Sequence, residues 1–332
     1  MACLVDLNSN DRCYLYASHS FGRLEYSVNS ALMQPDISKF HAIIEWEDGQ
    51  WLLSDISRNG VWLNKKRIDK YEKYPLALDD QIDFSKYNTA SFQVENLNSP
   101  CDLLIPLVNK ESEQVNAVEL RDYTCLPSEN NPEVVAYYDK SKYQWMLEYN
   151  VQNNETPVTL LNDGQRILLL NRPWVFQRNI LSSPTEKLDF SSHLMSDLTF
   201  IFYLSQDEES TQMKVIIEGE ELDLKERSHH YLLLNLARHK AFDARSNLSA
   251  TEQGWVYNEK LAQELGLPET HINIQIHRIR KQMITSLANV LDITHIIERC
   301  SGRIRLGASR FQVFKGGRLE CEMNYGQCRK LA

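Results

Sequence analysis

Residues Asp36–Trp46 read DISKFHAIIEW and place two different features side by side. The run His41–Trp46 is apolar, aromatic and β-branched and is followed by the turn signal Glu47–Asp48–Gly49, so it predicts a β-strand. The hydroxyl of Ser38 and the ammonium group of Lys39 stand just before this strand. A hydroxyl donor beside a cation at a strand end is suited to binding an anion.

The rest of the first hundred residues shows the same alternation of short apolar runs and turn signals, which is typical of a β-sandwich. The Ser99–Pro100 pair follows the last run and predicts a domain boundary, so we expect a sandwich over residues 1–100. The expected strands are Tyr14–Ala17, Leu24–Val28, His41–Trp46, Trp51–Asp55, Gly60–Leu63, Ile82–Phe84 and Ala90–Val94.

Length and composition indicate a multidomain globular protein. The chain has 332 residues, 42% hydrophobic and 24% charged, which predicts two or three domains with separate cores. It contains no run of 18 apolar residues and no basic-then-apolar N-terminal signal, so we expect no membrane association and no secretion. Seven scattered cysteines without a C-x-x-C pair favour a reduced, cytoplasmic location.

Charge is distributed unevenly along the chain. The net charge is −9 overall, but residues 212–332 carry 18 basic and 14 acidic side chains, whereas residues 101–211 carry 8 and 17. Within residues 270–318 the count is 9 basic against 2 acidic. A basic C-terminal patch on an acidic protein predicts a local anion-binding face there.

Three ordered motifs in the first hundred residues resemble the forkhead-associated (FHA) domain, a phosphothreonine-peptide-binding β-sandwich. They are the pair Gly22–Arg23, the Ser-x-x-His motif of Ser38 and His41, and the Ser-x-Asn-Gly-x-x-x-Asn stretch of Ser57, Asn59, Gly60 and Asn64. Three such motifs in order are far more specific than any one of them. The resemblance covers about residues 1–98 and also includes the run LALDDQIDF at 76–84.

The resemblance implies a phosphate site whose chemistry suits these residue types. A phosphate offers a charge near −2 and three acceptor oxygens, and Arg23 has a guanidinium group able to donate two parallel bonds to it. Arg58 stands where the family usually has a small hydroxyl residue, and it either adds a cationic contact or crowds the pocket. The expected phosphopeptide-binding residues are Arg23, Ser38, Lys39, Arg58 and Asn59, and the expected structural residues of the motif are Gly22, His41, Gly60 and Asn64.

Residues 101–195 are predicted to form a second β-rich domain. The stretches 133–148 and 160–170 resemble 41–54 and 76–84, so this region is either a degenerate FHA-like copy or a set of ordinary hairpins. Glu129–Asn130–Asn131 fall where Ser38 would lie, and no Gly-Arg pair precedes them. We therefore expect a structural or partner-binding role without phosphate binding.

The stretch Leu261–Met283 has the pattern of a helix-turn-helix. Gly266 is expected to end the first helix in a left-handed conformation, and Pro268 to open the second. The spacing of Ile272, Ile276, Ile279 and Met283 predicts one buried stripe, with His271, Gln275, Arg278 and Gln282 on the opposite face.

The sequence around these helices resembles the winged helix of response-regulator effector domains, over about residues 198–308. The resemblance implies an α+β domain at 196–310 that binds double-stranded DNA, followed by a C-terminal tail at 311–332. It departs from the class in the short Gly-Leu-Pro turn at 266–268 and in the lack of a receiver domain. The expected DNA-binding residues are His271, Asn273, Gln275, Arg278, Lys281, Arg299, Arg303 and Arg305.

These observations favour a cytoplasmic transcriptional regulator that senses a threonine-phosphorylated protein through an FHA domain and binds DNA through a winged helix. The alternative is a signalling or secretion-system adaptor whose winged helix only docks proteins. The chain has none of the G-x-x-x-x-G-K, G-x-S-x-G and H-E-x-x-H motifs, so we expect no enzymatic activity. We also expect no cofactor, metal or membrane partner, and a homodimer remains open.

Overall fold

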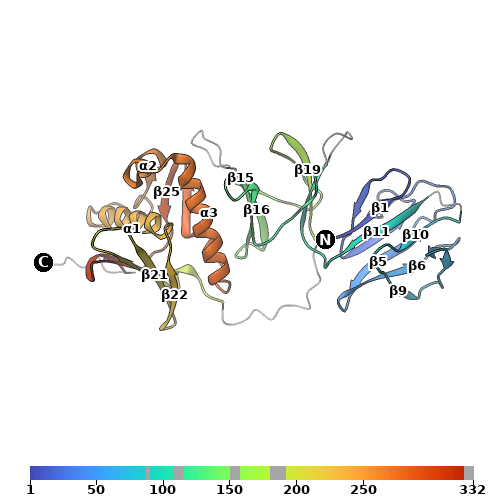
Figure 1. Cartoon of the computed structure of the whole chain (residues 1–332), viewed down its shortest axis with the longest axis horizontal. Helices are drawn as coiled ribbons and strands as arrows, with labels where there is room; N and C mark the ends of the chain where they lie inside the picture. Colours follow the sequence, from blue (N-terminus) through green and yellow to red (C-terminus); the bar gives the residue numbers. More distant parts are fainter. Residues whose placement is uncertain (87–89, 108–114, 150–157, 180–191, 325–332) are drawn as a thin grey trace. The chain divides into compact units, whose positions relative to one another are not determined.

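The computed structural model describes residues 1–86, 90–107, 115–149, 158–179 and 192–324 of the chain. It divides into two compact units (Figure 1). Unit 1 comprises Met1–Leu120 and Asn162–Thr185, and unit 2 comprises Arg121–Leu161 and Glu186–Ala332. The region 101–195, expected to be one β-rich domain, is therefore shared between the two units.

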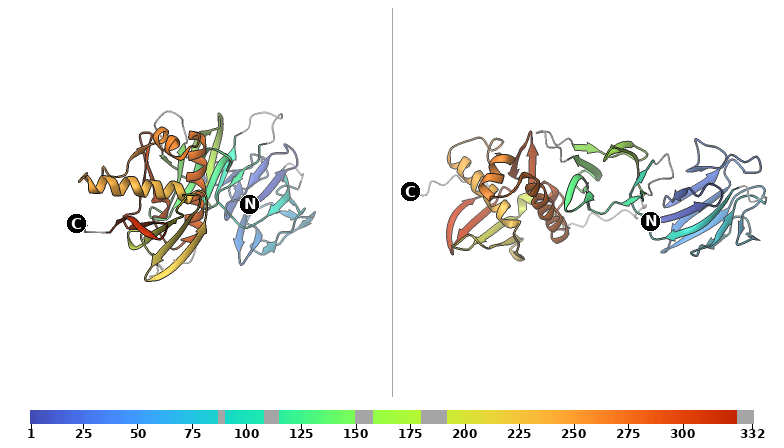
Figure 2. Two further views of the ribbon diagram at one scale, coloured as in Figure 1. Left: turned by 60° about the vertical axis from the view of Figure 1, so that its left-hand side comes forward. Right: turned by 45° about the horizontal axis from the view of Figure 1, so that its top comes forward.

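Unit 1 begins with a sandwich of two sheets. One sheet has the strand order β2-β1-β11-β10-β7-β8 and the other β4-β3-β5-β6-β9. Figures 1 and 2 show the two layers of the sandwich in blue and cyan. The expected strand at Leu24–Val28 is wrong, because this segment is a turn in which Leu24 and Tyr26 are exposed. The strands are β1 (Ala2–Asp6), β2 (Arg12–Tyr14), β3 (Ser18–Gly22), β4 (Ser30–Ala31), β5 (Ala42–Glu47), β6 (Gln50–Asp55), β7 (Trp62–Leu63), β8 (Lys66–Arg67), β9 (Lys73–Pro75), β10 (Gln81–Asp83) and β11 (Ser91–Leu97).

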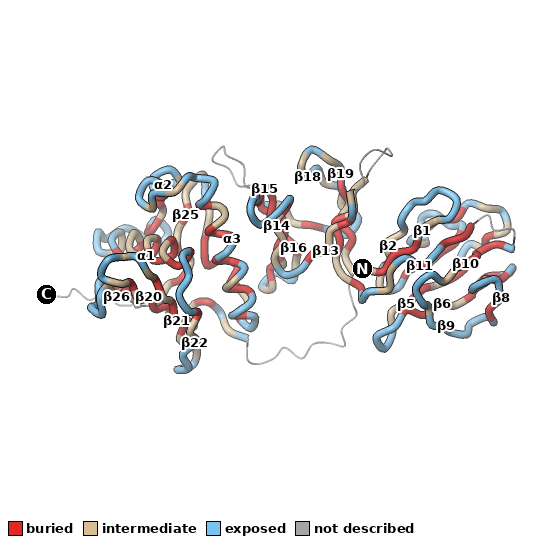
Figure 3. The backbone as a smooth tube through the Cα atoms, in the orientation of Figure 1, coloured by how far each residue is buried: buried red, intermediate tan, exposed pale blue. Residues whose placement is uncertain are grey.

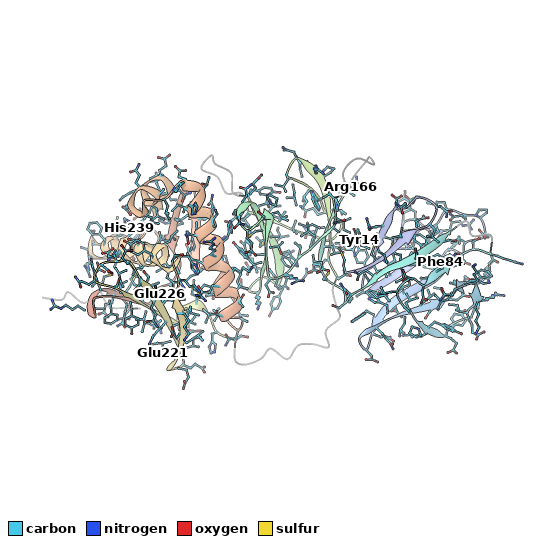
Figure 4. All side chains as sticks on the ribbon, viewed as in Figure 1. Tyr14, Phe84, Arg166, Glu221, Glu226 and His239 are labelled. Carbon is cyan, nitrogen blue, oxygen red and sulfur yellow. The ribbon has the colours of Figure 1, made fainter. Side chains whose placement is uncertain are left out.

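Aromatic side chains fill the space between the two layers. Phe21 from β3 stacks on Phe84, with ring centroids 4.7 Å apart, and Phe84 meets Phe92 of β11 edge-on at 5.7 Å. All three lie in the buried core, which runs between the layers (Figure 3), and Phe84 is labelled in Figure 4. Such ring contacts add stability beyond area burial and so hold the two sheets together under the loops that follow β3 and β6.

Strands from the region 101–195 form two separate four-stranded sheets. In unit 1 the order is β13-β12-β19-β18, with β12 (Leu103–Pro106), β13 (Val118–Glu119), β18 (Arg166–Leu169) and β19 (Arg172–Gln177). In unit 2 the order is β14-β15-β16-β17, with β14 (Tyr123–Ser128), β15 (Asn131–Asp139), β16 (Gln144–Tyr149) and β17 (Val158–Leu160). The second sheet belongs to unit 2 because β14 and β15 pack on a helix of that unit.

The described part of unit 2 also contains a five-stranded sheet, three α-helices and the three-stranded sheet β23-β25-β24, in which β24 and β25 form a hairpin. The sheet order is β22-β21-β20-β26-β27, and β20 pairs with β26 in parallel. The elements are β20 (Thr199–Leu204), β21 (Thr211–Ile217), β22 (Glu220–Glu226), α1 (His230–Arg245), β23 (Val256–Tyr257), α2 (Asn258–Leu265), α3 (Glu269–Ser286), β24 (Ile297–Cys300), β25 (Arg303–Leu306), β26 (Phe311–Lys315) and β27 (Arg318–Met323), with short 3₁₀ turns at Met195–Asp197 and Ile293–Ile296.

The expected C-terminal tail at 311–332 is wrong for residues 311–323, which form β26 and β27. Phe311 and Val313 alternate with less buried neighbours and are fully buried, because β26 lies inside the sheet beside β20. Residues 325–332 lie outside the described residues.

The helical part of unit 2 agrees with several local expectations. Helix α2 ends at Gly266, which has φ 64° and ψ 30°, the left-handed conformation that glycine adopts without strain. The stripe Ile272, Ile276, Ile279 and Met283 of α3 is buried in the main core of the unit. The element order α2, α3 and hairpin β24–β25 is the one expected from sequence.

A buried ion cluster joins the sheet β14–β17 to α3. Glu148 of β16 lies 2.8 Å from Arg280 of α3 and 3.1 Å from Arg299 of β24. The three side chains are only 3–6% exposed. Burial alone would raise the pKa of Glu148, but the two guanidinium charges outweigh it and lower that pKa to about 2.

This cluster predicts a pH-dependent stability of unit 2. Because the folded-state pKa of Glu148 is below its usual value, its contribution is present above about pH 4.5 and disappears as the pH falls towards 2. Replacing Glu148 by Gln should lower the free energy of unfolding at pH 7 by about 3 kcal/mol. All α-helices of the described residues lie in unit 2, so urea unfolding followed by ellipticity at 222 nm measures it.

The matched control is Glu133→Gln, which removes the same charge from an exposed position on β15. It should change the unfolding free energy little at any pH. A Glu148→Gln variant as stable as Glu133→Gln at pH 7 would show that the ion cluster does not hold unit 2 together.

Candidate phosphopeptide site on the FHA loops

The loops after β3, before β5 and after β6 meet at one end of the sandwich. The backbone N–H of Arg23 donates to the carbonyl of Ser38 at 2.9 Å, and that of Leu24 to the carbonyl of Lys39 at 3.3 Å. The backbone N–H of Arg58 donates to the hydroxyl oxygen of Ser38 at 3.0 Å. Ser38 is therefore the meeting point of all three loops.

Gly22 allows the close approach of two of these loops. A Cβ atom at position 22 would lie 2.2 Å from the carbonyl oxygen of Lys39, a separation that real structures do not contain. The glycine of the Gly-Arg pair is thus required by the packing of backbone on backbone. It lets Arg23 stand directly beside Ser38 and Lys39.

His41 joins the loop before β5 to the loop after β6 from inside the sandwich. Its Nδ1 accepts from the backbone N–H of Ser38 at 2.9 Å, so Nε2 carries the proton and donates to the carbonyl of Gly60 at 3.1 Å. The ring is fully buried and meets Phe84 edge-on. Burial lowers the pKa of His41, although the bond to Gly60 opposes this, so the imidazole is neutral at physiological pH.

Two further motif residues fix the third loop. The buried hydroxyl oxygen of Ser57 accepts from the backbone N–H of Gly60 at 2.7 Å. Asn64 donates from its amide to Asp80 at 2.7 Å and accepts from the backbone N–H of Gln81 at 2.9 Å, so it braces the turn before β10. These bonds turn the loop into a rigid support for Arg58 and Asn59.

The loops carry three exposed cations, Arg23, Lys39 and Arg58. Among the described residues, none of the three is paired with a carboxylate. Asn59 is also exposed and donates from its side-chain amide to the carbonyl of Asp36 at 2.5 Å. The sequence motifs thus fall together into one cationic surface, which we call the phosphate loops: Arg23, Ser38, Lys39, Arg58 and Asn59.

Arg67 of β8 lies beside the phosphate loops and was not expected from sequence. It donates to the carbonyl of Asn59 at 3.3 Å and lies over the ring of Trp62. A Cβ at Gly60 would strike its guanidinium group. The short β7–β8 hairpin, which the sequence did not predict beyond Leu63, brings Arg67 back to this loop.

Some of the expected DNA-binding residues of unit 2 are exposed, and others are buried or paired with a carboxylate. His271 and Arg278 are exposed, and Arg303 of the hairpin lies over the rings of Trp255 and Tyr257. Arg305 pairs with Glu298 at 2.6 Å and stacks on Trp255.

Two of these expectations need correction for this structure. Gln275 is 8% exposed and Arg299 has a side chain 6% exposed, so neither can reach a nucleic acid. Gln275 shares a helix face with Gln282, whose amide bonds His229, His230 and the carbonyl of Leu224, so that face is turned inward. Arg299 is held by Glu148 and also donates to Asn273 at 3.2 Å. Lys281 is exposed but pairs with Glu129.

Other kinds of site find no support in the described part of the chain. It contains no group of three or more His, Cys, Asp or Glu side chains able to hold a metal ion. No helix within the described ranges is long and apolar enough to cross a membrane.

Comparison with known proteins finds an FHA domain within unit 1. The family model of the FHA domain matches residues 19–85, which contain every residue of the phosphate loops. A curated relative, the E3 ubiquitin-protein ligase RNF8 of Pongo abelii, is 26% identical over 111 residues, which are 32% of this chain and 23% of the ligase. The chain thus spans about a quarter of that relative's length.

Similar solved structures include Mycobacterium tuberculosis EmbR in complex with a low-affinity phosphopeptide. It is 25% identical, with 30% of this chain and 25% of that chain covered and a TM-score of 0.27. Another is the N-terminal FHA domain of Rad53p from S. cerevisiae in complex with a phosphothreonine peptide, 24% identical, with 28% and 91% covered and a TM-score of 0.26. With the three motifs and the family match over residues 19–85, this part of the chain is an FHA domain, a module of the phosphothreonine-peptide-binding family.

Proposed function

We propose that unit 1 binds a threonine-phosphorylated segment of a partner protein at the phosphate loops. The observation that carries this proposal is that three exposed cations without a carboxylate partner among the described residues lie on loops whose backbones meet at Ser38. A dianionic phosphate would receive charge-assisted bonds from Arg23 and Lys39 and a hydroxyl bond from Ser38. Asn59 would contact the peptide backbone, and Arg58 would add a third positive charge.

The size of these interactions suits a reversible signalling contact. Each hydrogen bond to a charged group contributes about 1.5–3 kcal/mol net. Three of them contribute about 4.5–9 kcal/mol, and with contacts from Asn59 to the peptide backbone the total reaches the roughly 8 kcal/mol of micromolar binding. The loops are already held by His41, Gly22 and Ser57, so little binding energy would be spent on ordering them.

The proposal extends to a transcriptional regulator in which α3 and the β24–β25 hairpin bind DNA. Its support is the cluster of cations on this helix and hairpin, of which Arg278 is exposed on α3 and Arg303 is partly exposed on the hairpin, over the rings of Trp255 and Tyr257. The alternative, an adaptor that only docks proteins, is favoured by a different observation. The side of α3 that carries Arg280 and Lys281 contacts an acidic sheet of the same chain.

Replacing Arg23 by Ala in the full chain should abolish binding of phosphothreonine peptides, because it removes two charge-assisted bonds to the phosphate. We expect a loss of affinity of at least about a hundredfold from two bonds of about 1.5 kcal/mol or more. Calorimetric titration with a peptide pool of fixed phosphothreonine and randomised flanks measures this loss. Arg166→Ala, the same change at an exposed position of β18, is the control.

Equal binding of phosphorylated and unphosphorylated pools by the unaltered chain would refute the phosphate site. Undiminished binding by Arg23→Ala would place the phosphate elsewhere.

Gly22→Ala should also abolish phosphopeptide binding without touching a phosphate ligand. Its Cβ would collide with the Lys39 carbonyl and separate Arg23 from Ser38. The control is Gly49→Ala in the β5–β6 turn, where a Cβ would meet nothing within 4 Å, although its φ of 81° makes the change somewhat destabilising. Peptide titration and urea unfolding of both variants separate lost binding from lost folding, and a folded Gly22→Ala variant with normal affinity would contradict the role of this glycine.

DNA binding predicts different behaviour for two arginines. If Arg278 reads a base, Arg278→Ala should weaken the binding free energy by about 1–3 kcal/mol and relax the sequence preference at that one base position. Arg303→Ala should weaken binding to all sequences and lower the salt slope by about one unit. Titration of DNA selected from a random pool, at several salt concentrations, tests both. If the unaltered chain retains no duplex at low salt and neither variant changes this, the adaptor alternative holds.

A further inference from the structure

One side of α3 is covered by the sheet β14–β17, which we call the cover. Strands β14 and β15 pack along this helix, and α3 stands beside β15 and β16 in Figure 1. The side of α3 that faces the cover carries His277 and Arg280, three residues apart, with Lys281 at its exposed edge. It is next to the buried stripe but distinct from it.

The contacts between the cover and this side are polar and opposite in charge. Glu148 pairs with Arg280 and Arg299, and Glu129 pairs with Lys281. The hydroxyl of Tyr123 lies 2.6 Å from Nδ1 of His277.

Contacts continue beyond the end of the helix. Lys140 donates to the carbonyl of Ala288 at 2.9 Å, and Asp139 lies 3.6 Å from His295. Residues 121–161 contain six acidic and three basic side chains, so the cover is negatively charged.

The apolar cores suggest that the cover is an addition to the helical part. The stripe of α3 belongs to a large core formed with α1, α2, the hairpin and the five-stranded sheet. The cover has a separate small cluster of Val135, Tyr137 and Met146, and Tyr123 is the residue that packs against both. An interface held mainly by ionic and polar contacts resembles those that open and close.

The carboxylate of Glu148 lies between the guanidinium groups of Arg280 and Arg299. A carboxylate between two arginines satisfies the same guanidinium donors that bind a phosphodiester. With the cover removed, α3 and β24 would present Arg280, Lys281 and Arg299, the three cations that the cover now pairs with carboxylates. Three cations so placed match the backbone of a duplex better than any partner of neutral or positive charge.

We propose that the cover is a built-in competitor of duplex DNA for this side of α3, so that DNA affinity depends on how often the cover lifts. This inference rests on the DNA-binding part of the proposed function. A ligand that binds only the uncovered form has an apparent affinity reduced by the fraction of uncovered molecules. DNA binding and cover closure are then mutually exclusive.

The test changes only the cover, in the full chain, and leaves all residues of α3 and the hairpin intact. Glu148→Gln removes the carboxylate between the two arginines, and Glu129→Lys opposes Lys281 with a like charge at an exposed position. The controls Glu133→Gln and Glu133→Lys make the same charge changes at an exposed residue of β15 that bonds only Asn131 among the contacts described. A random-sequence duplex at low salt is the probe.

Loss of the Glu148 carboxylate should raise the small fraction of uncovered molecules at least about tenfold. Apparent affinity rises by the same factor, so we expect Glu148→Gln to bind this duplex at least about ten times more tightly than Glu133→Gln. Glu129→Lys should also bind more tightly than Glu133→Lys. Hydrogen–deuterium exchange without DNA should be faster in α3 and in β14–β16 of both cover variants. Since Glu129 is exposed, its variant remains folded even if Glu148→Gln does not.

The outcomes separate the two claims. If the unaltered chain binds the duplex and the cover variants bind no better than their controls, the competition is refuted while DNA binding stands. If exchange in α3 rises but no variant retains the duplex, DNA binding itself is refuted, and the competition with it. Tighter binding together with faster exchange, in cover variants only, supports the proposal.

Discussion

The bridge that His41 makes between Ser38 and Gly60 is the constraint on which the FHA loops depend. A single neutral imidazole accepts from one loop and donates to another, and it does so from a fully buried position against Phe84. Because both ring nitrogens are used, neither loop can shift without leaving a buried polar group unpaired, which costs about 1–3 kcal/mol. Ser38 is thereby held where its hydroxyl oxygen also meets the backbone of Arg58, and Gly22 brings Arg23 to the same place. The aromatic core of the sandwich thus determines the geometry of an exposed, charged surface.

Both units carry clusters of cationic side chains, which are exposed in unit 1 and paired with a carboxylate in unit 2. In unit 1 the cations Arg23, Lys39 and Arg58 are open to solvent. In unit 2 Arg280 and Arg299 already hold an anion, the carboxylate of Glu148, supplied by the chain itself. Arginine suits both situations because its planar group binds carboxylate and phosphate in similar ways. The roles that we propose for the two units rest on this difference between an open and an occupied cationic surface.

Local features of this structure were predictable from sequence, whereas long-range packing was not. The FHA motifs, the helix Asn258–Leu265, the left-handed Gly266 and the buried stripe of α3 all depend on residues within a few positions of one another. The burial of Gln275 and Arg299 depends on which distant elements pack on α3, and helical periodicity carries no information about that. The same limit explains why the sequence alone predicts one domain over residues 101–195 and a tail from residue 311, whereas the structure divides the first and forms strands over residues 311–323. Arg67 was missed because only the β7–β8 hairpin brings it next to Asn59.

The most direct test of the account is the amide NMR spectrum of the full chain during titration with a peptide pool of fixed phosphothreonine and randomised flanks. The account predicts saturable shifts concentrated at Arg23, Ser38, Lys39, Arg58 and Asn59, with no such shifts from the same pool carrying unmodified threonine. Shifts that are equal for the two pools, or that appear elsewhere while these five amides stay unchanged, would contradict it.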